Sequence, residues 1–216
     1  GDLMYGGTGD DVYIVDNSRD VVVESASQGV DSIHSSVGLI LGSNLENLVL
    51  TGTAAINGIG NELDNVITGN ASANILIGAG GADTLEGGGG NDVLIGDTSG
   101  GLGGSDILRG GSGNDLYGYA AGYGQDVIQE NDATPGNQDL VYLDSAALAV
   151  GLAESGSNLT VSIHGDSGSL TVQDWYAGAE FQTEVFVASD GSMLLSTQVD
   201  QLIQAMAQFS VSTGLS

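Results

Sequence analysis

Aspartate residues recur in this chain inside glycine-rich rows of nine residues. Each row follows the pattern G-G-x-G-x-D-x-U-x, where U is a large apolar residue, and the clearest rows span residues 78–86, 87–95 and 110–118. Glycine adopts a positive φ at no steric cost, so a glycine-rich segment can turn sharply and leave its carbonyl oxygens exposed. Carbonyl and carboxylate oxygens together suit calcium, a hard cation that takes about six to eight oxygen ligands. The rows therefore predict calcium sites.

The residues that follow each aspartate must form the element that positions it. Three residues such as Val93–Ile95 form a short strand whose middle residue turns inward. A large apolar residue stands two places after the sixth position in row after row. These residues are Ile67, Leu76, Leu85, Leu94, Leu108, Tyr117 and Ile128. A flexible linker does not maintain such a period, so the rows predict an ordered stack of turns and short strands.

The rows resemble the calcium-binding nonapeptide repeat of the RTX (repeats-in-toxin) family of haemolysin-type proteins. The resemblance implies an all-β fold, a parallel β-roll (β-helix solenoid). In this fold two rows make one coil, and several Ca²⁺ ions lie between turns stacked on the same edge. One edge would carry Asn65, Asp83, Asp106 and Asp126, and the other would carry Asn74, Asp92 and Asp115. The neutral Asn residues imply weaker or empty sites in the early rows.

The metal ligands that the resemblance implies are the aspartates of the rows and the glycines of the turns. They are Asp2, Gly7, Gly9, Asp11, Asp20, Gly80, Asp83, Gly88, Gly90, Asp92, Gly104, Asp106, Gly111, Gly113, Asp115, Gly124 and Asp126. The strongest sites should lie between two aspartates of one edge, as between Asp92 and Asp115. Asp97 lies in an insertion over residues 97–102, where its carboxylate could bind an additional cation or be solvated, and the solvated state is expected.

The order of the rows divides the chain into segments. Residues 1–24 should end a first array, and they open on the half row Asp2–Tyr5, which suggests a fragment of a longer protein. Residues 25–56 resemble the spacer between RTX arrays and should continue the solenoid without calcium. Residues 57–137 should form a second array.

The composition changes after residue 137. Residues 138–216 resemble the domain found after RTX arrays and should form a small β-rich C-terminal domain. Leu159–Ile163 and Leu170–Val172 alternate apolar and polar residues and predict a hairpin. A terminal helix is predicted over residues 198–209, with Thr197 as its N-cap. Its apolar stripe would be Val199, Leu202, Ile203, Met206 and Phe209.

Composition restricts the classes of function. The chain has 28 acidic and two basic residues, and its formal net charge is −26. This charge excludes nucleic-acid binding through the phosphate backbone as a main role, and it argues against electrostatic adhesion to an anionic membrane. The chain has no cysteine, which excludes disulfides and thiol catalysis. No apolar run reaches transmembrane length, so no membrane insertion is expected. Divalent cations would neutralise much of the negative charge.

No catalytic group is predicted, and the chain is expected not to be an enzyme. Gly165–Gly168 reads Gly-Asp-Ser-Gly, as around a protease nucleophile, but catalysis also requires a positioned histidine and aspartate. A hairpin turn explains this segment more simply. Carboxylates inside glycine-rich turns are better explained as cation ligands than as the acid and base of a glycosidase.

The leading hypothesis is a calcium-binding module that folds with calcium after type I secretion, as the C-terminal part of a larger exported bacterial protein. The resemblance implies a type I secretion ABC transporter as its partner during export and a secreted, extracellular or cell-surface location. Two alternatives stay open. One is an accessory module of a secreted hydrolase or polysaccharide epimerase, and the other is a segment of a cell-surface adhesin that binds glycans or other cells.

Overall fold

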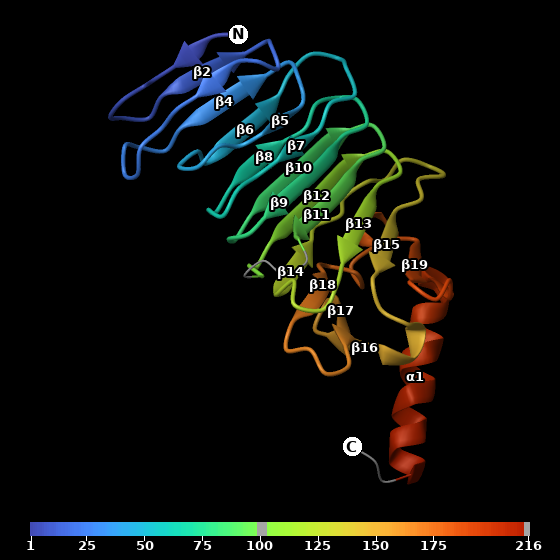
Figure 1. Ribbon diagram of the computed structural model, residues 1–216. Coiled ribbons are helices and arrows are strands. Elements are labelled where there is room, and N and C mark those ends of the chain that lie inside the picture. Colours follow the sequence, from blue (N-terminus) through green and yellow to red (C-terminus); the bar gives the residue numbers. More distant parts are fainter. Residues whose placement is uncertain (99–102, 214–216) are drawn as a thin grey trace.

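The computed structural model describes residues 1–98 and 103–213. Short strands stack along one long axis, and a helix ends the described chain (Figure 1). The described strands are β1 (Leu3–Met4), β2 (Val12–Val15), β3 (Val21–Val22), β4 (Ser32–Ser35), β5 (Leu39–Ile40), β6 (Asn47–Leu50), β7 (Gly58–Ile59), β8 (Val66–Thr68), β9 (Ile75–Ala79), β10 (Thr84–Gly89), β11 (Val93–Asp97), β12 (Ile107–Ser112), β13 (Leu116–Tyr119), β14 (Gln125–Ile128), β15 (Leu140–Leu143), β16 (Val150–Ser155), β17 (Asn158–Ile163), β18 (Ser169–Val172), β19 (Val185–Ala188) and β20 (Met193–Leu195). The described helices are α1 (Ser196–Thr213) and the short 3-10 turns η1 (Ala147–Ala149) and η2 (Ala179–Phe181).

Two sheets form the walls of the solenoid. In the described part of the chain, the parallel section of one sheet has the order β2-β4-β6-β8-β10-β12-β14-β18, and that of the other has β5-β7-β9-β11-β13-β15-β19. Alternate strands of the chain therefore pair in parallel, as Leu85 does with Leu108 and Leu94 with Tyr117. Each coil gives one strand to each wall. The predicted fold class, a parallel β-roll with a terminal helix, is confirmed.

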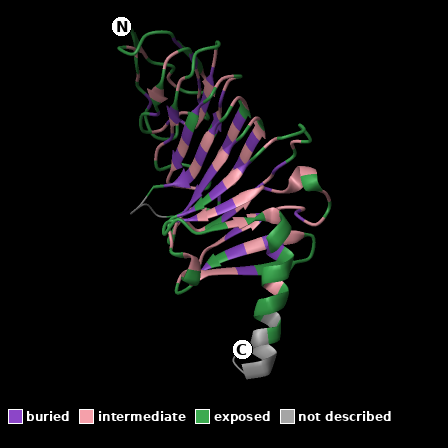
Figure 2. Ribbon diagram, turned by 90° about the vertical axis from the view of Figure 1, so that its right-hand side faces the viewer, coloured by how far each residue is buried: buried purple, intermediate pink, exposed green. Residues whose placement is uncertain are grey.

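One narrow core runs between the two walls. The apolar residues two places after the sixth position are each 0% exposed: Ile67, Leu76, Leu85, Leu94, Leu108, Tyr117 and Ile128. Buried and less buried residues alternate along the strands, because successive side chains of a strand point to opposite faces (Figure 2). Each row contributes about one core residue, so the turns must supply much of the stability.

The C-terminal strands extend both walls. β18 pairs in parallel with β14, and β15 pairs in parallel with both β13 and β19. The predicted hairpin is present, because β17 pairs antiparallel with β18, as Leu159 does with Val172. The rings of Trp175 and Phe186 pack with centroids 5.7 Å apart. Backbone hydrogen bonds thus connect the region after residue 137 to the array on both walls.

The terminal helix is longer than the predicted range of residues 198–209, since α1 spans Ser196–Thr213. Thr197 lies inside the first turn and is not the N-cap. Instead, the side-chain oxygen of Gln198 accepts a hydrogen bond from the backbone N–H of Leu195 at 3.1 Å.

The predicted apolar stripe of α1 is only partly buried. Val199 is 0% exposed, whereas Leu202 is 39% and Met206 is 42% exposed. The side chain of Phe209 lies outside the described residues. Only the start of the helix packs on β16 and β20, and the rest extends away from the sheets (Figure 1). Within the described chain, no helix combines the length and hydropathy needed to cross a membrane.

Candidate metal sites

Glycines in the left-handed conformation shape the turns that precede the strands. Their φ angles are 93° and 119° at Gly7 and Gly9, 98° and 108° at Gly88 and Gly90, 93° and 130° at Gly111 and Gly113, and 93° at Gly124. Side chains disfavour this conformation, so these positions require glycine. The turns bring each sixth-place residue to the start of a strand, at the same edge of the sheet as its neighbour one coil away.

The first predicted edge forms a ladder of hydrogen bonds at the starts of β8, β10, β12 and β14. The backbone N–H of Asn65 donates to Oδ1 of Asp83 at 2.7 Å. The N–H of Asp83 donates to Oδ1 of Asp106 at 2.8 Å, and the N–H of Asp106 donates to Oδ1 of Asp126 at 3.1 Å. Each carboxylate therefore contacts the backbone of the preceding coil.

The second predicted edge repeats this arrangement at the starts of β9, β11 and β13. The N–H of Asn74 donates to Oδ1 of Asp92 at 2.7 Å, and the N–H of Asp92 donates to Oδ1 of Asp115 at 2.7 Å. Two further residues extend the ladder. The N–H of Asp115 donates to Oδ1 of Asp139 at 2.8 Å, and the N–H of Asp139 donates to Oε2 of Glu184 at 2.8 Å.

The second oxygen of the stacked aspartates is buried without a hydrogen-bond donor. This is Oδ2 of Asp11, Asp83, Asp92, Asp106, Asp115 and Asp126. An unsatisfied buried acceptor costs roughly 1–3 kcal/mol, and more when it carries a charge. A cation beside each Oδ2 would remove this cost.

Backbone carbonyl oxygens line the same spaces. A Cβ on Gly78 would collide with Oδ2 of Asp83 and lie 2.5 Å from the carbonyl oxygen of Gly96, one coil on. Likewise, a Cβ on Gly87 would collide with Oδ2 of Asp92 and lie 2.6 Å from the carbonyl oxygen of Gly110. Glycine at the first place of a row leaves room beside a carboxylate oxygen and a carbonyl oxygen. This all-oxygen donor set fits Ca²⁺.

The same burial changes the acidity of these groups. Burial is the largest cause that raises the pKa of Asp92 to about 6, of Asp83 and Asp115 to about 7, and of Asp126 to about 8. The neighbouring Asp106 carboxylate raises the pKa values of Asp83 and Asp126 further. The raised pKa values mean that a cation must compete with protons for the same oxygens as the pH falls.

In the asparagine rows, hydrogen bonds from the side-chain amide satisfy the carbonyl oxygens of the turns without a cation. The side-chain amide of Asn65 donates to the carbonyl oxygens of Leu45 at 3.1 Å and Glu46 at 3.2 Å. The amide of Asn74 donates to the carbonyl oxygen of Ile56 at 2.6 Å. An amide N–H₂ therefore contacts carbonyl oxygens of the preceding coil, which supports weak or absent cation binding in these rows.

The remaining predicted ligands lie in two other places. At the N-terminus, the N–H of Asp2 donates to Oδ1 of Asp20 at 2.8 Å, between β1 and β3. Gly80 lies in the turn between β9 and β10, and Gly104 lies in the turn before β12. The N–H of Gly80 donates to the carbonyl oxygen of Asn61 at 3.0 Å.

The expectation that Asp97 is solvated is wrong, because its side chain is 0% exposed. Carboxylate oxygens of Asp97, Asp106 and Asp126 lie within 4.8 Å of one another. The N–H of Gly104 donates to Oδ2 of Asp97 at 3.2 Å, so the segment beyond the insertion folds back over the carboxylate. Burial first, and the charge of Asp106 second, raise the pKa of Asp97 to about 7. Residues 99–102 of the insertion lie outside the described residues.

Four further buried acids join these sites and were missed from the sequence: Glu24, Asp31, Glu130 and Asp139. None of them stands at the sixth place of a glycine-rich row, so the repeat pattern alone does not select them. One signal was available. The segments Asp20–Glu24 and Asp126–Glu130 both place a glutamate four residues after an aspartate, near a predicted end of an array.

Comparisons with known proteins identify the rows. Residues 59–94 and 100–125 match the RTX calcium-binding nonapeptide repeat, in four copies. The chain is 41% identical over 68 residues to the endo-1,3-1,4-beta-glycanase ExsH of Rhizobium meliloti, a match that covers 32% of this chain and 14% of that enzyme. It is 38% identical over 66 residues to the endo-1,3-1,4-beta-glycanase EglC of the same organism, covering 31% of this chain and 14% of that enzyme. The chain thus spans about 14% of the length of these relatives.

Proposed function

We propose that this chain, which carries RTX calcium-binding repeats, is a calcium-driven folding module of a larger exported bacterial protein. The observation that carries the proposal is the set of buried Oδ2 atoms without a donor, stacked at both edges of the solenoid. On one edge, Oδ1 of Asp106 accepts from the backbone N–H of Asp83, and on the other edge Oδ1 of Asp115 accepts from that of Asp92. Each link uses a single carboxylate oxygen. The other oxygen of each is free to bind a cation.

Electrostatics supports calcium as the folding switch. Neighbouring carboxylates on one edge are one coil apart, roughly 5 Å by the inter-strand spacing. Two unit charges at this separation repel by about 3 kcal/mol at an effective dielectric constant near 20. Calcium sites of extracellular modules have Kd values on the order of 10⁻⁴–10⁻³ M, so each tight site adds roughly 1.4 kcal/mol at about 1 mM calcium. Several sites together reach the stability of a small domain, about 5 kcal/mol.

These calcium affinities also connect the folding of the array to its export. Bacterial cytosol holds far too little calcium to fill sites of such affinity, so the array would stay unfolded inside the cell. An unfolded chain can pass through a type I secretion ABC transporter, and it would then fold in extracellular calcium. The proposed location is therefore secreted, extracellular or at the cell surface.

A second candidate function follows from the two relatives. Both carry glycanase names, and each match covers a minor part of the enzyme. The module would then act as a non-catalytic accessory of a secreted glycan-degrading enzyme. Linking the chain to a glycanase domain and measuring its activity with and without calcium would test this role. Equal activity with and without the module in calcium would contradict it.

Circular dichroism tests the leading proposal directly. In excess chelator the β signal of the chain should be largely lost, and titration with Ca²⁺ should restore it cooperatively. Magnesium is the matched control, because it demands octahedral geometry at about 2.0–2.1 Å and releases its water reluctantly. It should restore little signal at the same concentration. A β signal that persists unchanged in excess chelator would refute calcium-driven folding.

A further inference from the structure

A buried glutamate stands where a row would begin with glycine, at the end of the first array. Glu24 lies one coil after Gly6, and the N–H of Gly6 donates to Oε1 of Glu24 at 3.3 Å. The equivalent pair in the second array is Gly78 and, one coil later, Gly96. The carbonyl oxygen of Gly96 lines the space beside Asp83. At the end of the first array a carboxylate takes the place of that glycine.

The hydroxyl of Tyr13 is the second polar group that lies at this position. A Cβ on Gly6 would collide with Oδ2 of Asp11 and with the hydroxyl of Tyr13, so both oxygens border the same small space. The Tyr13 hydroxyl donates a hydrogen bond to Oε1 of Glu24. Burial and the Glu24 carboxylate raise the pKa of Tyr13 to about 12, so the hydroxyl keeps its proton. Both donors to Glu24 therefore reach the same oxygen, Oε1.

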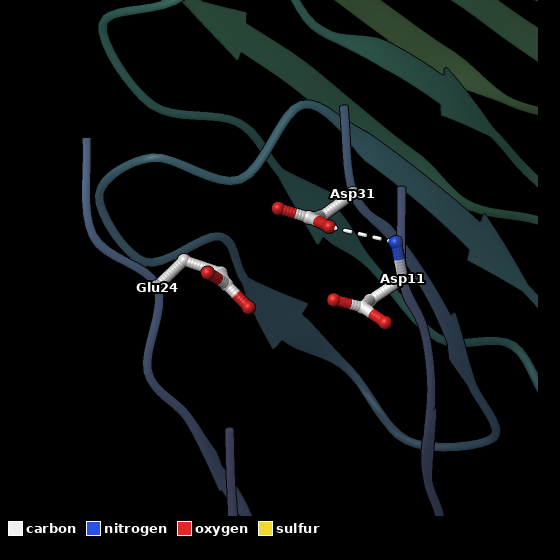
Figure 3. A group of neighbouring side chains, drawn as sticks. All are labelled: Asp11, Glu24 and Asp31. Carbon is white, nitrogen blue, oxygen red and sulfur yellow. Dashed lines mark hydrogen bonds between the residues drawn. The ribbon is translucent and has the colours of Figure 1, made fainter. Parts of the chain in front are cut away.

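The other oxygen of Glu24 has no donor. Glu24 is 8% exposed, and its Oε2 is buried without a hydrogen-bond partner. Figure 3 shows the Glu24 carboxylate directed toward Asp11 and Asp31. Oxygens of these three side chains lie within 4.8 Å of one another. Oδ1 of Asp31 accepts from the N–H of Asp11 at 2.9 Å, and Oδ2 of Asp11 is also without a partner.

We propose that Asp11, Glu24 and Asp31 form a divalent-cation site that closes the first array and binds Ca²⁺ through side-chain carboxylates from three successive segments. Three carboxylates outweigh the charge of one Ca²⁺, and all of their oxygens are of the hard type that this ion prefers. The site lies outside residues 59–94 and 100–125, which match the repeat family. It also needs a residue, Glu24, that the nonapeptide pattern does not contain.

The second array ends with the same combination of residues, so the arrangement around Glu24 occurs twice in the chain. Glu130 is 3% exposed, follows Asp126 by four residues and has a buried Oε1 without a donor. The Tyr117 hydroxyl donates to Oε2 of Glu130 at 3.1 Å, as Tyr13 donates to Glu24. The N–H of Asp115 donates to Oδ1 of Asp139, as that of Asp11 donates to Asp31. The same residue types thus recur in the same roles.

Counting bound calcium in the Glu24→Gln variant tests the site. The amide oxygen of glutamine can still accept from Tyr13, so the change removes charge and a cation ligand while keeping that bond. After equilibrium dialysis against 1 mM calcium, the variant should hold one ion fewer per chain than the wild type. Glu154→Gln is the control, because Glu154 is an exposed acid of β16, and it should lose no ion. Circular dichroism in calcium should show that all three proteins are folded.

Two results would overturn the inference. If Glu24→Gln binds as many ions as Glu154→Gln, the three carboxylates bind no cation, and only this inference fails. If the wild type binds no calcium at all, both this inference and the proposed function fail. Should Glu24→Gln not fold, Asp31→Asn replaces it, since the asparagine oxygen can still accept from Asp11. This variant should also lose one ion, and an unchanged count would again overturn the site.

Discussion

At the residue scale, one side-chain atom distinguishes the aspartate turns from the asparagine turns. Asp92 and Asn74 stand at equivalent places on one edge and are linked by a hydrogen bond of 2.7 Å. Oδ2 of Asp92 has no donor, whereas Nδ2 of Asn74 donates to the carbonyl oxygen of Ile56. Replacing an oxygen with an N–H₂ group turns an unsatisfied acceptor into a satisfied donor. We therefore expect the asparagine rows to fold without calcium.

The variant Asn74→Asp should make this row depend on calcium. Its carboxylate would face the carbonyl oxygen of Ile56 and lie next to Asp92, so a hydrogen bond is lost and repulsion is added. At limiting calcium the free energy of unfolding should fall by roughly 1–3 kcal/mol, and saturating calcium should recover much of this loss. Urea unfolding at both calcium concentrations measures it. Asn131→Asp adds the same charge at an exposed site, and an equal effect there would contradict the explanation.

Ala79 occupies a turn position that its counterparts Gly88 and Gly111 fill with glycine. Its φ is 89°, in the left-handed region that costs a residue with Cβ about 1–2 kcal/mol. The variant Ala79→Gly should therefore raise the free energy of unfolding in saturating calcium by roughly 0.5–1 kcal/mol, after the entropy cost of glycine. Denaturant unfolding measures the change. In the control Ala82→Gly, at an exposed alanine without a positive φ, stability should fall instead.

At the element scale, the sequence predicted the repeating unit well and its exceptions poorly. The nine-residue period predicted the strands, the inward residues such as Leu94, and the edges that hold Asp83 and Asp92. It could do so because each coil repeats one geometry. Asp97 was misjudged because an insertion separates it from the rest of its row. Glu24 was missed because it stands where the next coil would otherwise have the first glycine of a row. Its role becomes visible only when residues one coil apart are compared.

The stacked carboxylates also predict how the cation-free array responds to pH. Burial raises the folded-state pKa values of Asp92, Asp83 and Asp126 to about 6, 7 and 8, while an unfolded aspartate titrates near about 3.9. Raised pKa values give stability that is complete below about pH 4 and is lost as the pH rises through about 6–8. In chelator the β signal should therefore be larger at pH 5 than at pH 8.

Calcium should reverse this trend, because the ion binds the deprotonated carboxylates. In 1 mM calcium the β signal should be complete at pH 8 and weaken toward pH 5. Circular dichroism across this range in chelator and in calcium makes the comparison. Asp126→Asn should flatten the pH dependence in chelator, since it removes the group with the highest of these pKa values. A β signal in chelator that grows with rising pH would contradict the assignment.

At the scale of the whole molecule, the walls couple every segment to the calcium rows. β18 and β19 extend the sheets from β14 and β15, so each of them loses its parallel partner if the array opens and keeps only its antiparallel one. The segment with β4 and β6 differs, because the amides of Asn65 and Asn74 hold the neighbouring rows to it without a cation. Removing calcium should therefore open the molecule from the array toward the C-terminus.

Hydrogen exchange followed by mass spectrometry tests this order. In chelator, peptides that contain β10 to β14 should lose protection first, and peptides of β17 to β19 should lose it together with them, since backbone hydrogen bonds join the two regions. Peptides of β4 and β6 should retain more protection. Adding calcium should restore all of them in one transition. If β17 to β19 stay protected while the array exchanges freely, the C-terminal region folds alone and the array is not its template.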